Sequence, residues 1–175
     1  MNVKQHTMVA LCAVSLMAGC VSSGGGDAMN TEPVFMPSQF PQETYQVDPV
    51  MDASFATILN NVRLDAGAGP VAYNALLDQA AQGHADDMLA NDYFSHTDLN
   101  GNRVGTRVTA TGYKWKAVGE NLGKGHTSEE QVLDGWVNSP AHQAAQTRAR
   151  YEHFGLARAG TGRETRWVLV LAAPN

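Results

Sequence analysis

Two histidines and one glutamate in the second half of the chain could do chemistry, although their spacing alone does not single them out. His96 follows an aromatic pair at the mouth of a loop, and His142 lies just inside a helix begun by a Ser-Pro pair. Glu120 lies between glycines that allow close backbone approach. A carboxylate can orient a histidine base, and imidazoles with a carboxylate can hold a divalent metal. No local metal-binding motif is present, so any joint site must be assembled by the fold.

The remaining histidines have simpler interpretations. His84 lies on the apolar stripe of a predicted helix, where a core histidine with one hydrogen-bond partner is expected. His126 and His153 have polar neighbours and are expected on the surface. His6 belongs to an N-terminal segment of a different kind.

That N-terminal segment has the pattern of a secretory signal. Lys4 supplies a positive charge, residues 8–18 are apolar except for one serine, and small residues precede Cys20. The apolar run is shorter than the roughly 20 residues that span a bilayer. We expect residues 1–19 to be a lipoprotein signal peptide, removed before Cys20. The alternative is a plain signal peptide with an incidental cysteine.

Cysteine usage favours the lipoprotein interpretation. Of the two cysteines, Cys12 lies within the signal, which leaves Cys20 alone in the mature chain without a disulfide partner. Residues 17–20, Met-Ala-Gly-Cys, resemble the bacterial lipobox, with Met17 where leucine is preferred. Acylation of Cys20, with palmitate among the chains, would anchor the protein to a membrane. Val21 follows, and the absence of aspartate there favours the outer membrane of a bacterial envelope.

Composition separates a tether from a single folded domain. Residues 20–48 are rich in glycine, serine and proline, and are expected to form a flexible lipidated tether. The 175 residues suffice for one domain, expected over 49–175. A net charge of −5 without a basic stripe argues against a nucleic-acid partner.

Periodicity predicts the elements of that domain. Apolar residues at three- and four-residue steps predict helices over 52–66, capped by Asp52 or Ser54, and over 74–91. Shorter helices are expected over 104–111, after Ser128 and from Ser139. Residues 115–120 are expected to be extended, and strands over 154–159 and 166–172 are joined by a turn at 160–162. This order predicts an α+β fold.

Five short segments, in order, resemble the CAP superfamily of cysteine-rich secretory, antigen-5-like and pathogenesis-related proteins, above all its bacterial SCP-like branch. They are Asn-Asp-Tyr-Phe-Ser-His at 91–96, Gly-Tyr at 112–113, Gly-Glu-Asn-Leu at 119–122, Trp-Val-Asn-Ser-Pro-Ala-His at 136–142 and Phe-Gly-Leu-Ala at 154–157. The resemblance implies a three-layer α-β-α sandwich with a small, mainly antiparallel sheet.

The resemblance also implies a cleft where His96, Glu120 and His142 converge. This set is the expected binding cleft and the candidate catalytic set. The two histidines, with Glu120, are the candidate ligands of a divalent metal such as zinc, although no cofactor is required.

The eukaryotic members have a second glutamate three residues after the tryptophan of the fourth segment. Counting from Trp136 reaches Ser139, so the fourth member of the set is absent at that position. Glu129 or Glu130, on the same predicted helix, are the candidates to replace it.

Three functions remain open. The domain can bind a lipid, a glycan or another envelope component through the cleft. It can be a metal-assisted or His/Glu-dependent hydrolase of protease type, for which Ser95 and Ser139 are the serines nearest the histidines in sequence. Helix capping by Ser139 and backbone bonding by Ser95 are the simpler expectations. It can also be a structural envelope protein with a vestigial cleft.

Overall fold

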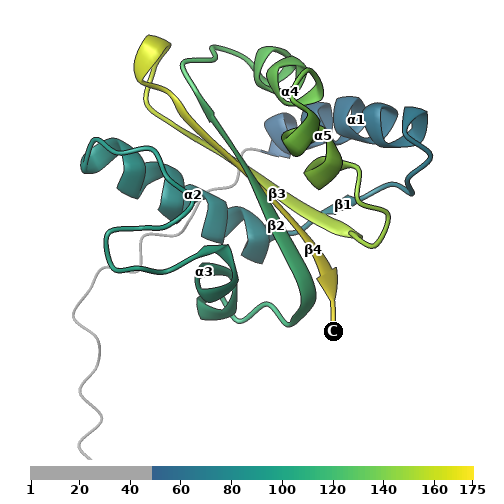
Figure 1. The fold of residues 1–175 in the computed structure, drawn as a ribbon, viewed down its shortest axis with the longest axis horizontal. Coiled ribbons are helices and arrows are strands. Elements are labelled where there is room, and N and C mark those ends of the chain that lie inside the picture. The colour runs from purple at the N-terminus through teal and green to yellow at the C-terminus, as the bar shows by residue number, and fades with distance from the viewer. Residues whose placement is uncertain (1–48) are drawn as a thin grey trace, which may run out of the picture. The chain divides into compact units, whose positions relative to one another are not determined.

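The computed structural model describes residues 49–175, with side chains from Ala53 onward (Figure 1). The expected signal peptide and tether, with Cys20, lie outside the described residues. The helices are α1 (Pro49–Asp65), α2 (Ala75–Ala90), α3 (Val104–Ala110), α4 (Glu129–Val137) and α5 (Pro140–Gln146). The strands are β1 (Ala72–Tyr73), β2 (Trp115–Lys124), β3 (His153–Ala159) and β4 (Arg166–Pro174), with a short 3₁₀ helix at Gly162–Glu164.

The strands form one sheet in the order β1-β3-β4-β2. β4 pairs antiparallel with both β3 and β2, and only the short β1 pairs parallel, with β3. β4 therefore lies inside the sheet, and all of it except its last residue is buried. β2, the strand that carries Glu120, lies at an edge of the sheet.

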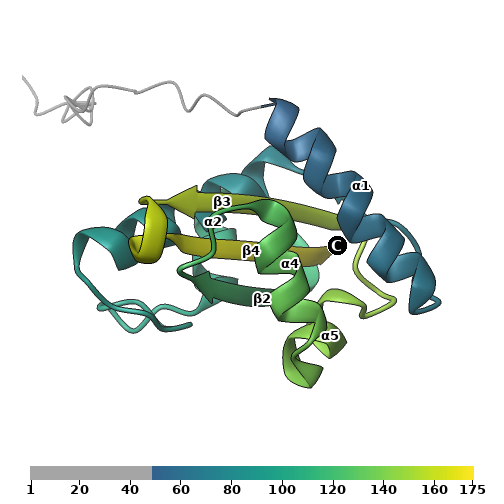
Figure 2. The ribbon, with the colours of Figure 1, turned by 90° about the horizontal axis from the view of Figure 1, so that it is seen from above.

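Two helical layers cover the two faces of the sheet (Figures 1 and 2). β4 shows the division, because alternate side chains of a strand point to opposite faces. Trp167, Leu169 and Leu171 pack in a core with α1 and α4. Val168 and Val170 pack in a second core with α2 and α3. The three-layer sandwich with a mainly antiparallel sheet is confirmed.

The helices and longer strands agree with the periodicity, and the exceptions have local causes. α1 begins at Pro49, so Ser54 lies within the helix, and its hydroxyl donates to Glu129 (2.6 Å) instead of capping the helix. β1 was missed because two residues show no periodicity. The predicted turn at 160–162 continues into the 3₁₀ helix.

Close packing holds α2 against the sheet. Asn74 caps this helix by accepting hydrogen bonds from the backbone N–H groups of Leu76 and Leu77. Gly155 on β3 permits the contact, since a Cβ there would lie 2.1 Å from the backbone nitrogen of Asp78. α2 is thus a fixed platform for the loop that follows it. Among the described helices, none is both long enough and apolar enough to cross a membrane.

Candidate functional site

The site is built at the edge strand β2, whose side chains alternate between the two layers. Val118 and Leu122 pack in the core with α2 and α3, which puts Glu120 on the same face. Asn121 points to the opposite face, where its amide donates to the carbonyl of His142 on α5 (3.1 Å). The predicted site residues therefore lie on both sides of one strand edge.

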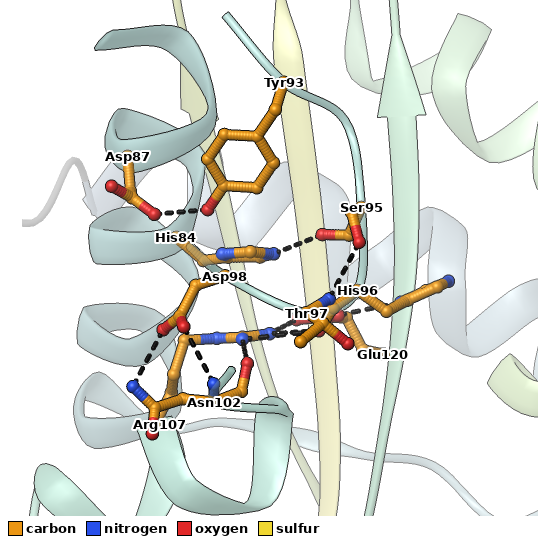
Figure 3. Close-up of polar contacts among 10 residues, drawn as sticks. All are labelled: His84, Asp87, Tyr93, Ser95, His96, Thr97, Asp98, Asn102, Arg107 and Glu120. Carbon is orange, nitrogen blue, oxygen red and sulfur yellow. Dashed lines mark hydrogen bonds and ion pairs between the residues drawn. The ribbon is translucent and has the colours of Figure 1, made fainter. Parts of the chain in front are cut away.

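Glu120 is the buried centre of one half of this site (Figure 3). Its Oε1 is 2.8 Å from Nδ1 of His96, and its Oε2 accepts from Nη2 of Arg107 at 2.7 Å. The exposed fractions of the side chains are 2% for Glu120, 12% for Arg107 and 51% for His96. A buried carboxylate is tolerated when both oxygens are paired, and here Arg107 also balances its charge.

The pairing with Glu120 sets the chemistry of His96. Because Nδ1–H donates to the carboxylate, the neutral ring carries its lone pair on Nε2. More than half of the His96 side chain is open to solvent, whereas Glu120 is covered. The group that the site presents to a ligand is therefore an oriented imidazole, with the carboxylate behind it.

Two helices fix the loop that carries His96. His84 on α2 donates from Nε2 to the Ser95 carbonyl (2.9 Å), and Arg107 on α3 donates to the His96 carbonyl (3.3 Å). Asp98 closes the loop by accepting from the backbone N–H groups of Asn100 and Asn102. These contacts hold the backbone of His96 from both sides.

His84 has the predicted role of a buried histidine with one hydrogen-bond partner. It is 1% exposed, and burial lowers its pKa while the nearby Glu120 carboxylate opposes that shift. Its Nδ1 has no hydrogen-bond partner among the described residues. A neutral ring with the proton on Nε2 is the form that supports the His96 loop.

Sequence reasoning missed Arg107. It is separated from Glu120 by 13 positions and lies on a seven-residue helix. No local spacing marks such an arginine, because its partner is brought to it by the pairing of β2 within the sheet. The nearest cations in sequence, Lys116 and Lys124, are both exposed, and neither gives a sign of the pairing with Arg107.

His142 belongs to the other half of the site. Its Nδ1 is 2.9 Å from Oγ of Ser139, and burial lowers its pKa, with a smaller lowering from the charge of His96. The two imidazoles are therefore close enough to interact electrostatically. Within residues 53–175, however, no hydrogen bond joins His142 to His96 or Glu120.

Ser139 differs from its predicted role. It occupies the N-cap position of α5, yet its hydroxyl makes no capping hydrogen bond and pairs with His142. The residue at the position of the absent second glutamate thus partners the second histidine. Ser95 behaves as expected, since its hydroxyl accepts from the backbone N–H of Thr97 (3.1 Å).

The other acids proposed to replace that glutamate lie elsewhere. Glu129 accepts a hydrogen bond from Ser54 on α1. Glu130 lines a groove between α1 and α4, together with Ile58. Neither residue is among those that line the pocket beside Glu120.

The side chains were tested as metal ligands. No group of three or more His, Cys, Asp or Glu side chains in residues 53–175 is arranged to hold a metal ion. Both oxygens of Glu120 are already paired, which leaves two imidazoles, whereas zinc enzymes supply three protein ligands. The residues as arranged do not fit a three-ligand zinc site, and zinc binding by the two imidazoles alone stays a prediction.

A pocket of about 240 Å³ opens beside Glu120 and is lined by His96, Arg103, Val104 and Glu120. The side chain of Arg103 is exposed and makes no hydrogen bond or ion pair within the described part of the chain. Arg107 offsets the charge of Glu120. The pocket therefore offers an imidazole and an unpaired guanidinium to a polar ligand.

The two histidines expected on the surface are half-buried and lie away from this pocket. Nδ1 of His153 is hydrogen-bonded to the Tyr113 hydroxyl (2.7 Å). The His126 carbonyl accepts from the indole of Trp167 (2.9 Å). Polar neighbours in sequence were a poor guide because both residues flank the buried strands.

Known proteins are similar to this chain in sequence and in fold. The family model described as CAP, cysteine-rich secretory protein family, matches residues 57–171. The chain is 23% identical over 111 residues to the uncharacterized membrane protein YlbC of Bacillus subtilis, covering 63% of this chain and 32% of YlbC. It is 26% identical over 99 residues to YkwD of the same organism, covering 57% and 38%. The chain thus spans about a third of the length of these curated relatives.

Solved structures agree on the fold. An outer surface protein from Borrelia burgdorferi superposes with a TM-score of 0.65 at 20% identity, covering 74% of this chain and 97% of that one. An extracellular protein with an SCP domain from Bacillus anthracis gives 0.64 at 20% identity, covering 79% and 45%. With the family model spanning well over half of the sequence, the chain belongs to the CAP, or cysteine-rich secretory protein, family.

Proposed function

We propose that the domain is an extracytoplasmic binding module that holds a lipid, a glycan or another envelope component in the pocket beside Glu120. One observation carries this proposal: Glu120 is buried with both oxygens paired, so it fixes His96 and Arg107 in place. A pre-organised imidazole next to a free guanidinium is suited to recognising a polar group, because little ordering is needed on binding.

The residues that line this pocket favour binding over hydrolysis. Glu120 has both oxygens paired, so the group with a free lone pair is Nε2 of His96, which can accept a hydrogen bond from a ligand or act as a base. The residues that line the pocket include no serine, threonine or cysteine to serve as a nucleophile. Recognition needs no nucleophile.

The binding proposal predicts a thermal-shift result. Envelope lipids, glycans and zinc are screened against the wild type and His96→Ala, with His126→Ala as a control histidine outside the pocket. A ligand that raises the melting temperature of the wild type and of His126→Ala should fail to do so for His96→Ala. A shift that survives in His96→Ala, or no shift with any of these ligands, counts against the proposal.

We further propose that the mature protein is anchored to the envelope through a lipid on Cys20. The apolar N-terminal run and the lipobox-like segment support this address. The relatives described as a membrane protein and an outer surface protein are consistent with it. Metabolic labelling with a palmitate analogue should mark the wild type and not Cys20→Ser. Unlabelled wild-type protein in the soluble periplasm would contradict the anchor.

A hydrolase remains the second candidate because of one contact. Ser139 Oγ lies 2.9 Å from Nδ1 of His142, and the lowered pKa of that ring keeps it neutral near pH 7. A neutral imidazole can accept a serine proton. A peptide and ester library tests this activity: cleavage lost in both Ser139→Ala and His142→Ala supports it, and cleavage that persists in either variant rules out this mechanism.

A further inference from the structure

A second pocket adjoins the first and is built around Trp115. It has a volume of about 600 Å³ and is lined by Arg103, Gly105, Thr106, Thr109, Ala110 and Trp115. Its residues come from the start of β2 and from α3 with the residue before that helix. Neither the cleft residues nor the five family segments account for it.

A strand irregularity puts Trp115 there. The pairing of β2 with β4 shifts register between Trp115 and Ala117. Without a shift, residues two apart would face the same layer. Ala117 packs in the core with α1 and α4, whereas Trp115 packs beside α3. The bulge thus turns this aromatic side chain toward α3, where it lines the pocket.

Two contacts fix the indole ring. Its Nε1–H donates to Oγ1 of Thr109 (3.0 Å). Gly105 makes room for the ring, since a Cβ at that position would lie 3.0 Å from Cζ2 of Trp115. The ring is half-buried, so part of it stays open to the pocket. The result is a rigid aromatic surface beside two threonines.

Arg103 joins the two pockets because it lines both. Its guanidinium makes no hydrogen bond or ion pair among residues 53–175. A charged side chain between an aromatic surface and an imidazole can pair with an anion on a ligand that spans both pockets. The arrangement from Trp115 through Arg103 to His96 is therefore one elongated surface.

We propose that this surface binds an acidic glycan, with a sugar ring on Trp115 and a carboxylate or phosphate group at Arg103. This inference rests on the proposed binding function and names its ligand class. Sugar C–H groups suit the negative face of an indole, and the threonine hydroxyls can bond sugar hydroxyls. The unpaired guanidinium then selects a charged glycan over a neutral one. A peptide is the alternative ligand, and the test below distinguishes it from a glycan.

The test measures binding to the mature protein by isothermal titration calorimetry. The probes are a trimer of galacturonic acid, its methyl-esterified neutral form and glucose 6-phosphate. The acidic trimer should bind at least tenfold more tightly than the neutral trimer, and Arg103→Gln should remove that preference. Arg150→Gln, an exposed arginine outside both pockets, should bind as the wild type does. Binding of the trimer but not of the sugar phosphate indicates recognition of a carboxylated chain, and the reverse indicates a phosphate-bearing sugar.

Gly105→Ala separates binding from folding. Its Cβ would lie 3.0 Å from Cζ2 of Trp115, so the ring must shift while the rest of the domain is untouched. This variant should still unfold cooperatively, as its melting curve will show, and should bind the acidic probe roughly tenfold more weakly. Gly83→Ala on α2, where a Cβ meets nothing within 4 Å, is the matched control and should bind normally. Trp115→Leu, which keeps apolar volume without an aromatic face, should lose binding as Gly105→Ala does.

Three results would overturn the inference. The first is equal affinity for the acidic and the neutral trimer. The second is unchanged affinity for the acidic trimer in Gly105→Ala and Trp115→Leu. The third is that neither the trimers nor the sugar phosphate bind, whereas a peptide from a peptide library binds the wild type and not Arg103→Gln. If an envelope ligand depends on His96 and Arg103 but not on Trp115, the proposed function stands and the acidic-glycan surface is wrong. If instead the ligand depends on Trp115 and Arg103 and binds His96→Ala as it binds the wild type, the Trp115 surface is supported and the pocket beside Glu120 is refuted.

Discussion

Replacing Glu120 with glutamine tests whether the buried ion pair organises the site. Glutamine keeps the shape and removes the charge that Arg107 meets at 2.7 Å. Removing one partner of a fully buried pair costs about 3–5 kcal/mol, because the other charge is left uncompensated. Arg107 is 12% exposed and still donates to the Asn102 and His96 carbonyls, which lowers the cost. We expect Glu120→Gln to destabilise the fold by about 2–3 kcal/mol.

Urea denaturation of a double-mutant cycle measures this pair. The free energies of unfolding of Glu120→Gln, Arg107→Met and the double variant are compared with that of the wild type. In a parallel thermal melt, a domain of this size should lose roughly 3–5 °C of melting temperature per kcal/mol of lost stability. The double variant should be less destabilised than the sum of the single variants by at least about 1 kcal/mol. The reason is that each single variant leaves the other member of the pair as an unpaired buried charge, whereas the double variant removes both charges.

Glu164→Gln is the matched control. Its carboxylate lies 3.4 Å from Nη2 of the buried Arg166 but is itself 66% exposed. Exposed carboxylates in ion pairs contribute about 0–1 kcal/mol, so this variant should change stability little. Equal costs for Glu120→Gln and Glu164→Gln, or strictly additive single costs in the cycle, would refute the reasoning that burial makes the Glu120 pair important.

Two further predictions concern α2. Burial raises the pKa of Asp78 to about 6 from 3.8, against an opposing hydrogen bond from the Leu156 main chain, so stability is lost as pH rises through about 4–6. Asp78→Asn should therefore gain about 2–3 kcal/mol at pH 8 and almost nothing at pH 3.5 in urea denaturation; equal effects at both pH values would contradict this. Gly155→Ala should cost about 3 kcal/mol or more by the same measurement, because its Cβ meets the α2 backbone, which cannot rotate away. A near-neutral result would show that α2 is not held tightly.

Elements with local signals could be predicted from the sequence. The capping role of Ser128 is confirmed, since its hydroxyl accepts from the Gln131 backbone N–H. α2 and the terminal strands agree with their apolar spacing, because that spacing puts the apolar side chains on the face that is buried. β1 has no such signal, since its position depends on pairing with β3 across about 80 residues of chain. The bulge at Trp115 depends likewise on pairing with β4 and not on the residues beside it.

The candidate site was predicted less completely, for a related reason. His96 and Glu120 were found through resemblance, and their contact is direct. Arg107 was missed because a charge partner is chosen by the fold and carries no sequence spacing of its own. Arg103 was missed because an exposed arginine becomes notable only when two pockets are seen to share it.

The strand edge explains why a serine replaces the second glutamate without loss of the second histidine's partner. Glu120 and Asn121 point to opposite faces, so the carboxylate that orients His96 cannot also orient His142. His142 must be held within its own layer, where the Asn121 amide fixes its backbone and Ser139 fixes its ring. A hydroxyl does this without adding a charge, and Arg107 is already committed to Glu120. The two histidines thus have separate supports, one on each face of the strand edge.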